Sequence, residues 1–281
     1  GTRPTDPYFQ RKFFQTPMVT YTKQLADLQI VGNAVTLELT QDWLQGRSGY
    51  GGWQAALAVK AMRALLGDEL PLRSLQVNFI APVPAGRVTA YAELLRRGKS
   101  VAQLEARILV DGRVAFTALG IFGGSRQTSI VHRPSAPAAA SDPETLADWP
   151  YVEGSTPEFM RNFHLRWGAG KPPYSGVAHA DAQIGVRLRD DAVTTEAHLV
   201  CMADAIPPSA LSLLTAPAML SSINWTLELV TPLAEEERND WFRFDSSLTA
   251  ANDGYAWENT AIWSARGNLV ALSRQCVAVF A

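Results

Sequence analysis

Ser74-Leu75-Gln76-Val77-Asn78-Phe79-Ile80-Ala81-Pro82 is the stretch that decides the fold, because the chain repeats it. A similar strand-like run, Asn224-Trp225-Thr226-Leu227-Glu228-Leu229-Val230-Thr231-Pro232, ends 150 residues later. Each run is followed by two more strand-like runs and a glycine-centred turn, at Gly112 and at Gly267. A repeat of this length indicates two copies of one domain. Two similar domains in one chain would pack face to face and share a site at their junction.

The composition is that of an ordinary globular protein. Of the 281 residues, 47% are apolar and 19% are charged. A net charge of −2 without a basic stripe argues against a nucleic-acid partner. No apolar run approaches the roughly 20 residues that span a bilayer, and residues 1–5 lack the pattern of a signal peptide. We therefore expect a cytoplasmic protein in which Cys201 and Cys276 are buried free thiols.

One long helix is predicted over residues 52–66. The segment has no proline, is rich in alanine and leucine, and ends at Gly67, which suits a C-terminal cap. Its apolar residues cover most of its circumference, so the helix is expected to be largely buried. The glycine-rich loop of residues 46–52 precedes it.

Antiparallel strands are predicted on both sides of a central linker. Period-two alternation is cleanest over residues 101–110, where alternate side chains would face the core. The second half is expected to carry a helix that includes residues 199–205. We predict an N-terminal domain over residues 1–126, a Pro- and Ala-rich linker over 127–158 and a C-terminal domain over 159–281. The other strands are expected at residues 18–28, 34–40, 87–95, 113–122, 181–189, 221–230, 241–250, 255–263 and 269–280.

Several local motifs, in this order and spacing, resemble the acyl-CoA thioesterase II family, also called the double-hotdog thioesterases. They are Gly51-Gly52 at the helix entry, Phe79-Ile80-Ala81-Pro82, the hairpin at residues 94–100, Met202-Ala203-Asp204, Ser221-Ser222-Ile223-Asn224, and Leu269-Val270-Ala271 followed by Gln275. The resemblance covers nearly the whole chain outside the linker. It implies an α+β double hotdog, in which each module is an antiparallel sheet wrapped around a long buried helix.

The resemblance also implies a catalytic set in the second half. Asp204 and Gln275 take the positions of the family's Asp and Gln, and Ser222 stands where well-known members have Thr. Asn224 stands where an acidic residue is frequent, so the activity of the site is an open question. The implied reaction is hydrolysis of an acyl-CoA thioester by an oriented water, with no metal and no cofactor beyond the coenzyme A of the substrate.

Thioester hydrolysis needs a base for water and donors for the developing oxyanion. Asp204 would act as the general base, and backbone N–H groups at Gly51 and Gly52 would meet the oxyanion at a helix N-terminus. Trp53 is a candidate for lining an acyl pocket, and Arg97 and Lys99 are candidates for attracting the phosphates of coenzyme A.

Each candidate also has an ordinary structural interpretation. Asp204 would end a helix, Ser222 would be an ordinary strand residue, and Gln275 would face solvent. By the same logic Gly51 and Gly52 would make a tight turn, Trp53 would pack in the core, and Arg97 and Lys99 would be a solvated turn.

Two rival functions remain open at this stage. A hotdog hydratase would add water to an enoyl-CoA, although its Asp-x(4)-His pattern is absent from both helices. A non-catalytic protein would bind an acyl chain or coenzyme A without turnover. No Gly-x-Ser-x-Gly elbow or metal-type histidine spacing occurs. Acyl length is not predicted, and assembly into a homo-oligomer through exposed sheet edges or faces is left open.

Overall fold

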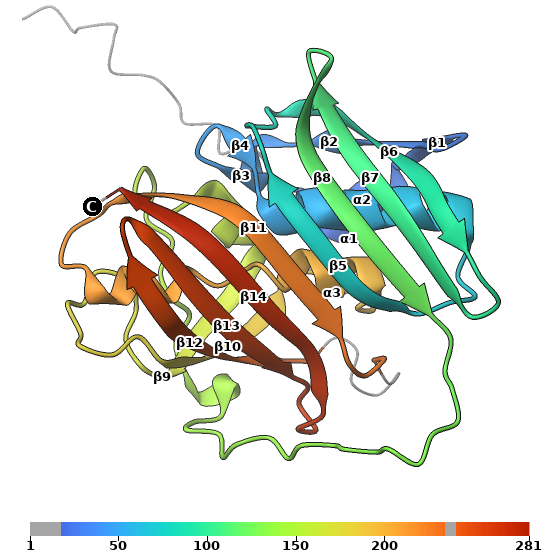
Figure 1. Cartoon of the computed structure of the whole chain (residues 1–281). Helices are drawn as coiled ribbons and strands as arrows, with labels where there is room; N and C mark the ends of the chain where they lie inside the picture. The colour runs from blue at the N-terminus through green and yellow to red at the C-terminus, as the bar shows by residue number, and fades with distance from the viewer. Residues whose placement is uncertain (1–17, 234–239, 281) are drawn as a thin grey trace, which may run out of the picture.

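The computed structural model describes residues 18–233 and 240–280, which form one continuous antiparallel sheet with two buried helices (Figure 1). The predicted absence of a signal peptide concerns residues that lie outside this range. In sheet order, the N-terminal strands are β1 (Gln29–Val31), β2 (Ala34–Leu39), β6 (Gly86–Arg97), β7 (Val101–Val110), β8 (Arg113–Gly123) and β5 (Leu72–Phe79). The C-terminal strands continue the sheet as β11 (Met219–Leu229), β14 (Leu269–Phe280), β13 (Tyr255–Trp263), β12 (Phe242–Asn252), β10 (Ala182–Leu188) and β9 (Phe163–Ala169).

The two halves share one strand plan, which confirms the double-hotdog prediction. The order β2-β6-β7-β8-β5 in the first half corresponds to β10-β12-β13-β14-β11 in the second. The repeated sequence runs form β5 and β11, and these two strands pair with each other antiparallel, with Leu75 opposite Leu227. The duplication therefore builds the junction between the modules.

Helix α2 (Gly51–Leu66) is the central element of the N-terminal module. Twelve of its 16 residues are buried, and Gly67 ends it with a φ of 76°, a conformation that favours glycine. Figure 1 shows α2 on the side of the sheet toward which the strands curve, with α3 nearby. The predicted helix over residues 52–66 is confirmed.

Helix α3 (Glu196–Met202) of the C-terminal module is short, with only seven residues. Thr195 and His198 form a capping box at its start, and Asp204 follows its C-cap, Ala203. Pro207-Pro208 lies just beyond, where a helix cannot continue. The prediction of a long helix in each module therefore holds only for the first.

The strand predicted over residues 18–28 is wrong, because helix α1 (Tyr21–Ala26) occupies that segment. The Thr20 side chain accepts a hydrogen bond from the Lys23 N–H, which is the bond of an N-terminal cap. Smaller elements are the hairpin of β3 (Leu44–Gln45) and β4 (Ser48–Gly49), and the 3₁₀ turns η2 (Gln41–Trp43), η3 (Pro143–Thr145), η4 (Glu158–Asn162) and η5 (Ser209–Leu213).

The linker is held against the C-terminal module by charge. Asp148 accepts hydrogen bonds from Arg166, His164 and Arg189 at 2.7–2.8 Å. Burial raises the pKa of Asp148, but these bonds prevail and lower it to about 2. The linker is therefore irregular in structure but docked.

Candidate active site

The Asp204 carboxylate lies at the N-terminus of helix α2, although the two residues come from different modules. The Gly52 backbone N–H donates a hydrogen bond to this carboxylate, and the Gln275 side-chain amide donates another. The positive end of the helix dipole favours a carboxylate at this position. The structure thus brings together two of the three residues predicted as catalytic, beside the two predicted glycines.

The missing side chains of the two glycines allow this close approach. A Cβ on Gly51 would lie 2.5 Å from Asp204 Oδ2, and a Cβ on Gly52 would overlap the carbonyl oxygen of Cys201. Neither glycine has a positive φ, so close packing between the ends of α2 and α3, and not backbone conformation, demands glycine here.

The environment of Asp204 favours the neutral form of its carboxyl below about pH 7. Burial raises the pKa of the carboxyl, and the hydrogen bonds from Gln275 and Gly52 lower it, while the charge of Glu258 raises it further. The resulting pKa is about 7, against 3.8 for an ordinary Asp. A carboxylate with this pKa is a stronger base than a solvated one and is half-ionised near neutrality.

Ser222 lies on β11 and shares a cavity with Asp204. The pairing of β11 with β14 shifts register between Ser222 and Asn224, so the strand bulges at Ile223 beside the site. Asn224 is exposed and lies opposite Cys276 on one side and Asn78 on the other.

This cavity has a volume of about 330 Å³ and lies where β5 ends and β11 begins. Both modules line it. The lining residues are Gln45, Arg47, Ser48, Gly49, Gly51, Gln54, Phe79, Ile80, Ala81, Pro82, Asp204, Leu220, Ser221 and Ser222. A site at the junction agrees with the expectation from the duplication.

Tyr50 and Gln54 support the cavity, although neither was a candidate from the sequence. The buried Tyr50 hydroxyl donates to the Cys201 carbonyl at 2.6 Å and accepts from the Asp204 backbone N–H. Gln54 Nε2 donates to the Gly49 carbonyl at 2.6 Å. Arg47 is an exposed cation on the cavity lining. Arg47 and Tyr50 lie within the glycine-rich loop of residues 46–52 and Gln54 follows it, so this loop was the signal that could have pointed to them.

Comparison with known proteins gives the family. A family model described as the acyl-CoA thioesterase N-terminal domain matches residues 39–123, and one described as the acyl-CoA thioesterase C-terminal domain matches residues 137–279. The chain belongs to the acyl-CoA thioesterase family. No curated protein sequence matches it.

Several solved structures share the fold of this chain. A hot dog fold protein of unknown function from Alicyclobacillus acidocaldarius is 20% identical, with a TM-score of 0.84 over 94% of this chain and 99% of that one. A putative thioesterase II from Thermobifida fusca is 22% identical, with a TM-score of 0.76 and coverage of 90% and 95%. An acyl-CoA thioesterase II from Mycobacterium marinum is 19% identical, with a TM-score of 0.71 and coverage of 92% and 97%. At these identities the likeness shows the fold.

Three predicted substrate-binding residues of this acyl-CoA thioesterase family member lie away from the junction cavity. Trp53 is fully buried in the core, where its indole N–H donates to Gln24 at 2.7 Å. Arg97 is level with Leu72 through the pairing of β6, β7, β8 and β5, whereas the cavity lies at Phe79. Seven residues of strand separate these levels, roughly 23 Å. Arg97 instead pairs with Glu69 at 2.9 Å, and Lys99 lies in the exposed turn beyond it.

The histidines and cysteines of this chain do not build a metal site within residues 18–233 and 240–280. His198 bonds to Thr22 at 2.7 Å and caps α3 through Thr195, which is a structural role. Both cysteines are free thiols as predicted, with Cys201 buried and Cys276 only half-buried. No described helix is long and apolar enough to cross a membrane.

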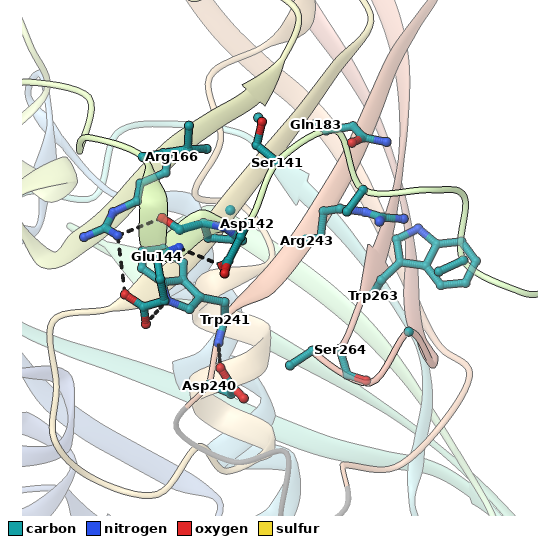
Figure 2. A pocket seen from close by; sticks show the side chains of 18 residues that line it. Ser141, Asp142, Glu144, Arg166, Gln183, Asp240, Trp241, Arg243, Trp263 and Ser264 are labelled. Atoms are coloured by element: carbon teal, nitrogen blue, oxygen red, sulfur yellow. Dashed lines mark hydrogen bonds and ion pairs between the residues drawn. The ribbon is translucent and has the colours of Figure 1, made fainter.

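A second cavity of about 240 Å³ lies between the linker and the C-terminal sheet (Figure 2). Arg166 stacks on the Trp241 ring at 4.6 Å, and the Trp241 indole N–H donates to Glu144 at 2.7 Å. Arg166 also approaches Glu144 at 3.6 Å. These groups satisfy one another, so we attribute this cavity to linker docking.

Proposed function

We propose that this protein hydrolyses acyl-CoA thioesters, with a water molecule activated by Asp204 and oriented by Ser222 and Gln275. The observation that carries the proposal is the Asp204 carboxyl, with a pKa of about 7, held by Gln275 and the Gly52 N–H at a cavity shared by both modules. A base of that strength in a concave junction site suits attack of water on a carbonyl carbon.

The chemical steps need only groups that surround this cavity. Asp204 takes a proton from water as its oxygen attacks the thioester carbon, and the oxyanion is stabilised by the N-terminus of α2. The C–S bond then breaks, and the departing thiolate receives the proton that Asp204 holds. Because the Gly52 N–H already bonds to Asp204, the Gly51 end of the helix is the better candidate for the oxyanion.

The cavity lining suggests how the substrate lies. Arg47 is a cation at the cavity, so we propose that it attracts the phosphates of coenzyme A. The apolar side chains Phe79, Ile80 and Leu220 are candidates for contacting the acyl chain.

A panel of acyl-CoAs assayed with a thiol reagent tests this function. We expect release of free coenzyme A, with kcat/KM rising with pH through an apparent pKa of about 7, because Asp204 must be ionised to accept a proton. Hydration of an enoyl-CoA without thiol release would assign the protein to the hydratases. Binding without turnover would make it an acyl-CoA carrier.

Arg47→Gln provides a specific check of the substrate orientation. It should raise KM for acyl-CoA severalfold, with the effect weakening at high salt, because an exposed cation acts through a screened field. KM for a short thioester that lacks the nucleotide should not change. Arg97→Gln is the matched control, because Arg97 lies at the opposite end of the strands from the cavity.

A further inference from the structure

A second carboxyl is buried next to the Asp204 site. Glu258 on β13 is 8% exposed and shares the inward face of the strand with Ala256, Thr260 and Ile262. Burying a carboxyl in such a position is costly unless its charge or its hydrogen bonds are used. The burial of an acid at this position therefore needs a physical explanation.

Ser209 holds this carboxyl in place. The Ser209 backbone N–H donates to Glu258 Oε2 at 2.6 Å, and the Ser209 hydroxyl donates to the same carboxyl. This hydroxyl also lies 2.5 Å from Ser246 Oγ. A neutral glutamine would accept the same N–H bond equally well. In the described part of the chain, the surroundings that act on Glu258 are burial and Ser209, with no cation among them. Hydrogen bonding to Ser209 therefore does not explain why residue 258 is a glutamate and not a glutamine.

The strand register connects Glu258 with the site. Glu258 lies directly opposite Gln275 in the pairing of β13 with β14, and Gln275 donates to Asp204. Side chains in opposite positions of an antiparallel pair adjoin on one face of the sheet. The charge of Glu258 also acts on Asp204 and disfavours its ionised form.

We propose that Glu258 is a positioning residue of the site, whose carboxyl beside Gln275 disfavours the ionised form of Asp204. The inference rests on the proposed hydrolysis and goes beyond the residues assigned to it. Burial raises the pKa of Glu258 itself to about 7, so its charge appears in the same pH range as that of Asp204. The other titratable groups that act electrostatically with Asp204 are Tyr50 and Cys201, and burial raises both of their pKa values, so they stay neutral there.

Glu258→Gln tests the proposal, because it removes the charge and keeps an acceptor for Ser209. The acidic limb of kcat/KM should move to lower pH by about one unit, since a like charge near Asp204 has been removed. Glu258→Asp keeps the charge and should leave the limb near its wild-type position. Glu228→Gln, at an exposed site on β11, two strands from β13 in the sheet, should not move the limb and is the matched control.

A purely structural role for Glu258 would lower kcat in Glu258→Gln without moving the limb, and that result would overturn the proposal. A limb that moves equally in Glu258→Asp would overturn it as well. Titration of the Asp204 carboxyl by carbon-13 NMR, assigned with Asp204→Asn, gives a readout besides activity. If Glu258→Gln lowers this pKa but the wild type hydrolyses no thioester, the proposed function fails and the electrostatic coupling stands. If hydrolysis occurs and the Asp204 pKa is the same in both proteins, the coupling fails alone.

Discussion

At the scale of single residues, Asp204 is the proposed general base, and burying its charged form lowers the stability of the folded protein. Its pKa is about 7 in the folded protein and near 3.8 in an unfolded chain, so the folded state binds the extra proton. Stability from this group is therefore present at low pH and is lost as pH rises from about 4 to about 7.

Asp204→Asn should accordingly lose activity and gain stability at alkaline pH. We expect kcat to fall by about 10²- to 10⁴-fold, because the proposed general base is removed. The melting temperature relative to wild type should be higher at pH 8 than at pH 5, because only the wild type must bury a charge at pH 8. Thermal denaturation at both pH values measures this. Equal melting differences at both pH values would contradict the buried-charge account.

Gln275→Ala should shift the pH profile in the direction opposite to Glu258→Gln. The Gln275 amide hydrogen bond favours ionised Asp204 and lowers its pKa, so its removal should move the acidic limb of kcat/KM to higher pH. A decrease in kcat should accompany this shift. Ser273→Ala, two residues earlier on the same strand, is a control that should leave the limb in place. A limb that stays in place in Gln275→Ala would show that this amide does not tune Asp204.

At this scale, the family pattern pointed to residues that lie together in the structure. Asp204 and Gln275 were chosen by resemblance, and the structure brings them into contact. Glu258 was missed, although its alternation with Ala256 and Thr260 places it on a buried face. Alternation tells which face a residue lies on, but not what lies across from it. Trp53 shows the same limit, because an aromatic residue at a helix entry packs in the core or lines a pocket according to contacts far away in the sequence.

At the scale of elements, the contact between the start of α2 and the end of α3 builds the site. A Cβ on Gly52 would overlap the Cys201 carbonyl oxygen, so Gly52→Ala should force the two helix ends apart. We expect about 1–3 kcal/mol of destabilisation, which is typical of overpacking, and a large loss of activity because the Asp204 contact is disturbed. Gly98→Ala is the control, because a Cβ there would meet only the Val101 carbonyl oxygen at 3.5 Å. Unchanged stability and turnover in Gly52→Ala would show that the two helix ends separate without cost.

The elements themselves were predicted well where periodicity was strong. Strands β7, β13 and β14 have the predicted bounds, because alternation and tight turns delimit them. The strand prediction for residues 18–28 failed because the β-branched Val19, Thr20 and Thr22 suggest a strand. The helix that forms there depends on the local cap at Thr20. A short helix has too few turns to display a period.

At the scale of the whole molecule, the two modules share one sheet and one buried core. The sheet passes without interruption from β5 to β11, and a single buried cluster includes residues of both modules. Leu75 and Leu227 lie opposite each other at this junction, and both are fully buried. A duplication detected in the sequence predicts two similar modules, but it does not predict that their repeated strands pair with each other.

This junction predicts that the modules unfold together. Leu75→Ala and Leu227→Ala should each cost about 2–5 kcal/mol, and the double variant should show a coupling energy of about 0.5–3 kcal/mol, because the side chains share one contact. Denaturant unfolding followed by circular dichroism and by tryptophan fluorescence should give coincident single transitions in all variants. Leu109→Ala, at an exposed position of β7, should change little. Leu75→Ala could instead split the unfolding curve into two transitions, with the second transition belonging to a C-terminal module that is still folded. Each module would then have a stability of its own. The candidate active site would in that case depend on the association of the modules and not on a common core.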